Sequence, residues 1–159
     1  MGCFKLPGFV YCHTMKQRVL VVCTGNSCRS QMAEGFLRRF SNSTMEVFSA
    51  GTHPCFVHPL AIAVMREVGV DISKHRSKFV DEFLGQRFDY VITVCDNAKE
   101  ACPVFPGAKR TVHMLFADPV QYIGPEEERL RCFRRVRDEI ASRMKDFLSQ
   151  IGIYSVSEH

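Results

Sequence analysis

Residues 19–36, VLVVCTGNSCRSQMAEGF, decide the fold of this chain. The stretch begins with an apolar, β-branched run that predicts a buried strand and ends in Cys23. A short polar loop then leads to Arg29, after which the apolar residues recur at helical spacing. The sequence therefore predicts a strand, a loop and a helix in direct succession, with a cysteine where the strand ends.

The rest of the chain continues this alternation. We expect further strands over residues 45–49, 90–94 and 111–114, and helical segments over residues 59–69, 80–84 and 125–151. Alternation of this kind predicts an α/β fold, a single three-layer domain with a four-stranded parallel sheet and helices on both faces. Ligands bind beyond the carboxyl ends of such strands, where Cys23 and Cys95 would both lie.

Length and composition limit the classes of protein to be considered. The 159 residues suit one domain, which we assign to residues 15–159, with residues 1–14 as an N-terminal extension of no clean period. The net charge of +4 comes from interspersed Lys and Arg, which suits a small anionic ligand and does not require a nucleic-acid partner.

No stretch resembles a secretory signal or a membrane span, so we expect a cytoplasmic monomer that binds no membrane. Eight cysteines in a reducing compartment indicate catalytic, redox or metal chemistry.

The loop after the first strand has the composition of an oxyanion site. Its backbone N–H groups and the positive end of the following helix can bind an anion, and Arg29 can hold two oxygens at once. The same field can lower the pKa of a thiol from about 8.5 into the range of about 3.5–7.5, so we expect Cys23 to be a thiolate at neutral pH. The Ser30 hydroxyl could hydrogen bond to that sulfur. The predicted anion ligands are Thr24, Gly25, Asn26, Ser27, Cys28 and Arg29.

Other residues suggest the remaining chemistry. Displacing hydroxide from an oxyanion needs a proton donor, and Asp118, in the sequence FADP, is the candidate. Cys95 and Cys102 could pass electrons on from Cys23 by thiol–disulfide exchange. A zinc site is not predicted, since the cysteine spacings include no Cys-x2-Cys pair.

Several motifs together resemble the thioredoxin-coupled arsenate reductases, which share their fold and anion loop with low-molecular-weight protein tyrosine phosphatases. They are CTGNSCRSQMAEGF, FSAGTHP, GVDISKHRSK, DYVITVCDNAKEACPVFP and FADP, and the resemblance covers about residues 17–145. It implies that Cys23 takes arsenate, that Cys95 attacks Cys23 to release arsenite, and that Cys102 attacks Cys95. The resulting disulfide of Cys95 and Cys102 would be reduced by thioredoxin. Phosphate or sulfate would mimic arsenate, and no tightly bound cofactor is implied.

Two further expectations concern the relay and a cation. Cys95 and Cys102 are seven positions apart, too far to bridge across a regular helix, so we expect residues 96–102 to unwind during turnover. Some relatives hold potassium behind the loop, but Lys78 stands where they carry an aspartate, which puts potassium in doubt. We hypothesise that the Lys78 ammonium takes the place of the cation and pairs with Glu34.

Two other functions remain open. A phosphatase would need only Cys23, Arg29 and Asp118. Phosphatase relatives usually carry proline where Gln31 stands and aromatic residues directly after the Asp-Pro pair, where this chain has Val and Gln. A non-enzymatic module that binds arsenic or oxyanions through its thiols is the second alternative. Glutathione with glutaredoxin also remains an alternative to thioredoxin.

Overall fold

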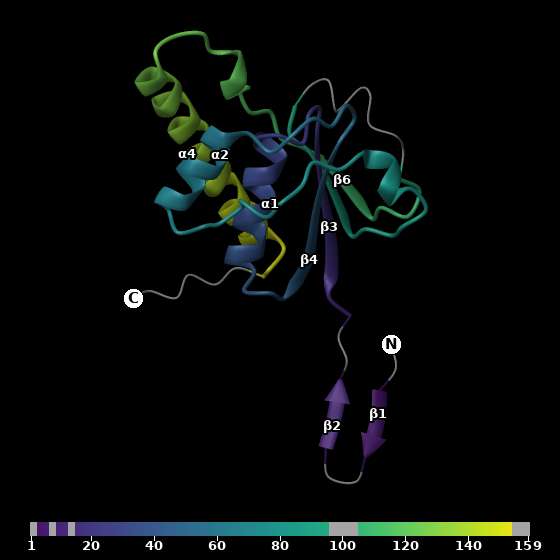
Figure 1. Cartoon of the computed structure of the whole chain (residues 1–159). Coiled ribbons are helices and arrows are strands. Elements are labelled where there is room, and N and C mark those ends of the chain that lie inside the picture. Colours follow the sequence, from purple (N-terminus) through teal and green to yellow (C-terminus); the bar gives the residue numbers. More distant parts are fainter. Residues whose placement is uncertain (1–2, 7–8, 13–14, 96–104, 154–159) are drawn as a thin grey trace.

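The computed structural model describes residues 3–6, 9–12, 15–95 and 105–153 (Figure 1). Its elements in chain order are β1 (Cys3–Leu6), β2 (Phe9–Cys12), β3 (Gln17–Cys23), α1 (Arg29–Phe40), β4 (Met45–Gly51), α2 (Pro59–Glu67), the 3-10 helix η1 (Val80–Phe83), β5 (Tyr90–Thr93), β6 (Arg110–His113), the 3-10 helix η2 (Pro119–Gln121) and α4 (Glu126–Gln150). The strands and long helices lie within a few residues of the predicted ones. The short segment near residue 80 is a 3-10 turn, because its four residues are too few for an α-helix to form stably.

The main sheet has four strands in the order β4-β3-β5-β6, and each neighbouring pair is parallel. The predicted fold class is thereby confirmed. Strand β3 lies between β4 and β5, and both of its faces are covered, so four consecutive apolar residues, Val19, Leu20, Val21 and Val22, are all 0% exposed. Continuous burial of this kind is typical of an inner parallel strand.

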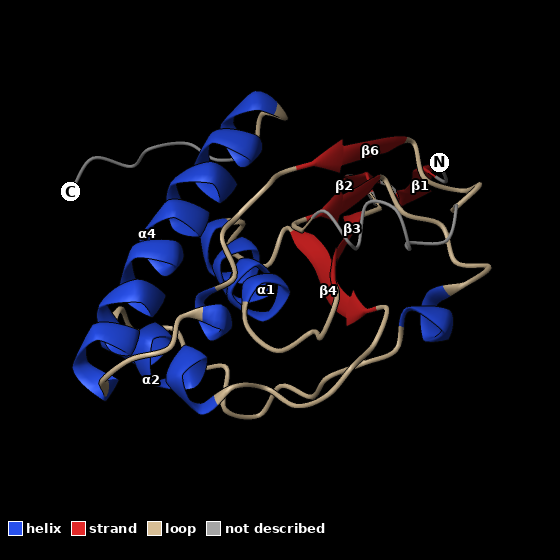
Figure 2. Ribbon diagram, turned by 90° about the horizontal axis from the view of Figure 1, so that it is seen from above, coloured by secondary structure: helices blue, strands red, loops and turns tan. Residues whose placement is uncertain are grey.

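In the part of the chain that the structure describes, three α-helices, α1, α2 and α4, lie along one side of the main sheet (Figure 2). Helix α4 contacts both α1 and α2. Its start is favoured by three glutamates in the first turn, which complement the positive end of the helix dipole. The apolar face of α4 is formed by Phe133, Val136, Ile140, Met144, Phe147 and Leu148, all of them buried.

An aromatic cluster packs on the other side of the sheet. Phe48 of β4, Phe83 of η1, Phe88 and Phe105 form a chain of ring contacts with centroids 5.6–6.1 Å apart. Phe48 points to this face of the sheet. Val47, the residue before it in β4, points to the opposite face, where the helices pack. The described cover of this face is therefore η1 together with its aromatic neighbours.

The N-terminal segment contains a second, two-stranded antiparallel sheet, β1 with β2 (Figure 1). The sequence had shown no clean period there, and strands of four residues are too short to give one. The boundary at residue 15 stays a prediction. None of the helices in the described ranges combines the length and apolarity that a bilayer span requires.

Candidate active site

The loop after β3 lies where the strand order of the sheet reverses, since β4 lies on one side of β3 and β5 on the other. Such switch points open a crevice at the carboxyl ends of the strands. The carbonyl groups of the loop are taken up by the segment after β4: Thr52 N–H donates to Cys23 O (3.2 Å), His53 N–H to Thr24 O (2.8 Å) and Cys55 N–H to Gly25 O (3.1 Å). With its carbonyls held on that side, the loop can turn N–H groups toward an anion.

Cys23 makes two hydrogen bonds at the end of β3. Its side chain is buried, and Sγ lies 2.8 Å from Ser30 Oγ and 3.2 Å from the backbone N of Asn26. Asn26 adopts a left-handed conformation, with φ of 46°, which lets its N–H point back at the sulfur. The predicted contact between Ser30 and Cys23 is therefore present.

The prediction that Cys23 is a thiolate at neutral pH is wrong for this conformation. Burial raises the pKa of the Cys23 thiol above its ordinary value, although hydrogen bonding with Ser30 and the charge of Arg29 act to lower it. Burial likewise raises the pKa of Cys28 to about 12. The prediction counted the favourable field of a helix N-terminus but not the desolvation of a fully enclosed sulfur, which favours the neutral thiol.

Arg29 and Asp118 meet at the mouth of the loop. Arg29 is the first residue of α1, and its Nη2 lies 3.4 Å from Asp118 Oδ2. Arg29 Nη1 also donates to the carbonyl of Phe116 at 3.3 Å. Asp118 caps η2 by accepting from Val120 N–H at 3.1 Å, so the loop that contains the Asp-Pro pair is fixed beside the guanidinium. The candidate acid and the candidate anion clamp are thus neighbours.

A second thiol reaches the same loop. Cys95 follows β5, is buried, and its Sγ lies 3.3 Å from Thr24 Oγ1. The sequence had not predicted this contact with Thr24, because it depends on the register of β5 against β3. Cys102 and the whole segment predicted to unwind, residues 96–102, lie outside the described residues.

Gly51 is a residue of the site that the sequence analysis did not single out. A Cβ atom added there would lie 2.5 Å from Thr24 O and 2.8 Å from Asn26 N, so only glycine lets β4 approach the loop this closely. The signal available in the sequence was a glycine directly after a strand, in the motif FSAGTHP.

Behind the loop, the hypothesis that the Lys78 ammonium pairs with Glu34 is wrong. Glu34 Oε1 lies 3.2 Å from Arg38 Nη2 and Glu34 Oε2 lies 2.9 Å from His75 Nδ1, whereas Lys78 Nζ donates to the carbonyl of Arg76 at 2.8 Å. Burial by itself would raise the pKa of Glu34, but the His75 hydrogen bond and the charges of His75, Lys78 and Arg38 hold it below the ordinary value. Lys78 therefore acts on Glu34 at longer range. Among the described residues, no three His, Cys, Asp or Glu side chains are grouped to hold a metal ion.

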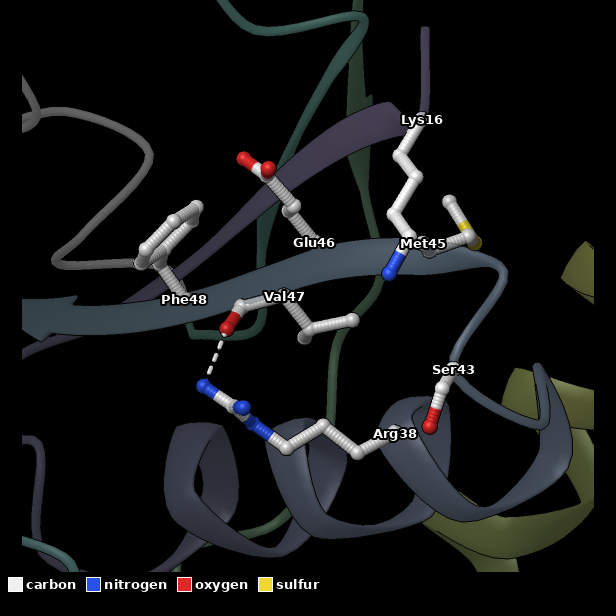
Figure 3. Close-up of a pocket in the computed structure, with 7 residues that line it drawn as sticks. All are labelled: Lys16, Arg38, Ser43, Met45, Glu46, Val47 and Phe48. Carbon is white, nitrogen blue, oxygen red and sulfur yellow. Dashed lines mark hydrogen bonds between the residues drawn. The ribbon is translucent and has the colours of Figure 1, made fainter. Parts of the chain in front are cut away.

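A hollow of about 370 Å³ lies elsewhere on the molecule, between α1 and β4 (Figure 3). It opens beside Met45, at the amino end of β4, where Arg38 Nη2 donates to Val47 O at 2.5 Å. It shares no residue with the loop and lies at the other end of the strands. This hollow is therefore not the oxyanion site.

A family model described as low molecular weight phosphotyrosine protein phosphatase matches residues 18–155. The chain belongs to this family. The matched residues of this chain begin in β3 and extend past the end of α4, so they include the loop, Asp118 and Cys95. The resemblance drawn from the motifs is confirmed.

Several proteins to which this chain is similar are named arsenate reductases. The arsenate reductase of Halalkalibacterium halodurans is 45% identical over 132 residues, which make up 83% of this chain and 95% of the relative. A solved structure of an arsenate reductase in the oxidized state has a TM-score of 0.73 and 33% identity, covering 86% of this chain and 99% of its own. The thioredoxin-dependent arsenate reductase of Corynebacterium glutamicum has a TM-score of 0.67 and 27% identity, covering 88% of this chain and 64% of its own.

Proposed function

We propose that this protein reduces arsenate to arsenite, with Cys23 as the nucleophile and thioredoxin as the final reductant. The observation that carries the proposal is the second buried thiol at the oxyanion loop, Cys95, whose Sγ is 3.3 Å from Thr24 Oγ1. Phosphate-ester hydrolysis has no use for a second thiol, whereas reduction of arsenic needs two electrons from a pair of thiols. The similarity to proteins named arsenate reductase supports the same reaction.

The first step forms a bond between sulfur and arsenic. Arsenate binds to the backbone N–H groups of residues 24–29 and to the Arg29 guanidinium, which can hold two of its oxygens. The Cys23 sulfur attacks arsenic and displaces one hydroxyl group, which leaves as water after receiving a proton from Asp118. The Asp118 carboxyl is suited to this task because it lies beside Arg29, where the leaving oxygen would be.

The second step transfers the electrons. The Cys95 thiolate attacks the Cys23 sulfur, a disulfide forms, and the electron pair of the sulfur–arsenic bond passes to arsenic. Arsenic(V) becomes arsenic(III) and leaves as arsenite, while two thiols have become one disulfide. Cys102 then attacks Cys95 and frees Cys23, and the disulfide of Cys95 and Cys102 is exchanged with thioredoxin.

Both thiols must ionise for this sequence to run. Because burial raises the pKa of Cys23, its proton must leave before the attack, and an oxygen of the bound arsenate dianion can accept it. Ser30 Oγ and the Asn26 N–H, at 2.8 and 3.2 Å from the sulfur, then stabilise the thiolate. We assign the reaction to residues 15–159, in a cytoplasmic monomer that needs no tightly bound cofactor.

The test is turnover of arsenate with thioredoxin, thioredoxin reductase and NADPH, run beside hydrolysis of phenyl phosphate. The proposal expects steady NADPH oxidation that depends on both arsenate and thioredoxin. A matched assay with glutathione and glutaredoxin identifies the alternative electron source. Hydrolysis of phenyl phosphate without arsenate turnover would instead assign the phosphatase function, which Cys23, Arg29 and Asp118 could support by themselves. Binding of arsenite with neither activity would assign the non-enzymatic module.

A further inference from the structure

The side chain of Gln31 makes an unusual set of contacts directly behind the loop. It lies in the first turn of α1 and is 0% exposed. Its Nε2 is 3.1 Å from Asn26 O, 3.0 Å from Asn26 Oδ1 and 3.0 Å from Arg76 O, and its Oε1 is 2.9 Å from His75 Nδ1. One buried amide thus connects the loop to the segment around residues 75–78.

The residue that Gln31 holds is the one that faces the nucleophile. Asn26 is in the left-handed region with φ of 46°, and its backbone N–H donates to Cys23 Sγ at 3.2 Å. Its side-chain Nδ2 donates to Ser30 Oγ at 2.8 Å, and Ser30 in turn contacts the same sulfur. Any change in the conformation of Asn26 would therefore disturb both contacts of Cys23 at once.

We propose that Gln31 is a positioning residue, which holds the carbonyl and side-chain oxygens of Asn26 and so fixes the conformation of this residue, keeping its N–H and the Ser30 hydroxyl directed at Cys23. This inference rests on the proposed role of Cys23 as the attacking thiol. Gln31 itself touches no reacting atom. An amide suits the position because its NH2 group can bind carbonyl oxygens without placing a charge in the interior.

The same contacts indicate that the protein folds without Gln31. Asn26 O also accepts from Ser77 Oγ at 2.7 Å, Asn26 Oδ1 from Lys78 N–H at 2.9 Å, and Arg76 O from Lys78 Nζ at 2.8 Å. Each acceptor therefore keeps one donor when the amide is removed. The expected consequence is a looser loop rather than an unfolded chain.

The experiment compares Gln31→Met with the unaltered protein. Methionine has similar length and good helix propensity but no donor. Two quantities are measured by mass spectrometry of the Cys23 peptide: the pH dependence of its alkylation by iodoacetamide, and the phosphate concentration that halves alkylation at pH 7. We expect alkylation at pH 7 to fall about tenfold, with its pH midpoint shifted upward, since a hydrogen bond to a charged group is lost or weakened. The phosphate concentration for half protection should rise severalfold.

Two further variants keep the test decisive. Gln150→Met makes the same exchange at the far end of α4 and should leave both quantities unchanged. Ser77→Ala removes the other side-chain donor to Asn26 O from a partly buried site, and should shift both quantities in the same direction by a smaller amount. Unchanged alkylation and protection in Gln31→Met would overturn the inference. If that variant cannot be purified folded, unchanged values in Ser77→Ala would overturn it.

Neither the alkylation of Cys23 nor its protection by phosphate involves turnover. The role of Gln31 and the proposed function can therefore be contradicted independently of each other. Absence of arsenate reduction by the unaltered protein contradicts the function, while the alkylation comparison still decides the role of Gln31. A Gln31→Met variant with full alkylation and full reductase activity contradicts the inference alone.

Discussion

A single sulfur atom decides the chemistry at the scale of residues. Burial favours the neutral thiol of Cys23, and Ser30 and Arg29 oppose it. The motif was enough to predict which residues surround the sulfur, because a strand, a glycine-containing loop and a helix can be recognised from neighbouring positions. It was not enough to predict the ionisation, since the burial of the sulfur depends on segments distant in the sequence, such as β4, which pairs with Cys23, and the end of β5, which brings Cys95 near.

Replacing Ser30 tests the balance at this sulfur. Ser30→Ala removes a hydrogen bond that lowers the pKa of Cys23, so the pKa should rise further and less thiolate should be present at neutral pH. Alkylation of Cys23 at pH 7 should slow by about tenfold or more. Ser41→Ala, at the other end of α1 and also buried, is the matched control and should leave the rate unchanged. Equal rates for Ser30→Ala and the unaltered protein would show that the contact has no influence on ionisation.

Replacing Asp118 tests the proton donor. Asp118→Asn keeps the size of the side chain and its cap on η2 but cannot supply the proton. We expect kcat for arsenate reduction to fall by roughly 10²–10⁴-fold, the usual contribution of a general acid. KM should not rise, because the loop N–H groups and the Arg29 guanidinium that bind the anion are unchanged. Steady-state kinetics at pH 7 measure both, and a variant with unchanged kcat would remove Asp118 from the mechanism.

The approach of β4 to the loop sets the site at the scale of elements. Gly51→Ala would place a methyl group 2.5 Å from Thr24 O. Overpacking of this kind costs about 1–3 kcal/mol, and the loop must shift to relieve it. We expect lower unfolding free energy in urea and weaker protection of Cys23 by phosphate. Gly124→Ala, which meets only the exposed ring of Tyr122, is the control and should be close to neutral.

Helix α1 is tied to the segment after α2 through Glu34, and this link predicts how stability depends on pH. The folded-state pKa of Glu34 is below its ordinary value of 4.5, so its contribution is complete above that value and is lost as pH falls through the folded-state pKa. Glu34→Gln should lower the unfolding free energy by about 1–3 kcal/mol at pH 7, with a smaller difference at pH 3. Urea titrations at both pH values measure this. A difference that grows as the pH falls would contradict the assigned pairing.

The elements themselves were largely predictable from the sequence. Alternating apolar strands and amphipathic helices gave β3, α1 and α4 within a few residues of their ends, because each pattern is local. The contact of Thr24 with Cys95 and the pairing of Glu34 with His75 could not be predicted. They depend on strand register and on where a loop crosses behind a helix, and no short-range pattern encodes either.

At the scale of the whole molecule, the parallel sheet gathers the reactive groups at one edge. Cys23 ends β3, Cys95 follows β5, and Asp118 enters from the loop after β6, so residues nearly a hundred positions apart lie at the same edge of the sheet. The strand order reverses at β3, which is where ligands bind in sheets of this kind. The second thiol at this edge is what separates the proposed reductase from a phosphatase.

The most direct measurement of the central claim is a single turnover of the fully reduced protein with arsenate, without thioredoxin, followed by arsenite quantification and peptide mapping. The account predicts about one arsenite per protein and a disulfide of Cys95 with Cys102. In Cys102→Ser the disulfide should join Cys23 to Cys95, and in Cys23→Ser no arsenite should form. Arsenite production by Cys23→Ser, or a full yield of arsenite with no disulfide among these three cysteines, would contradict it.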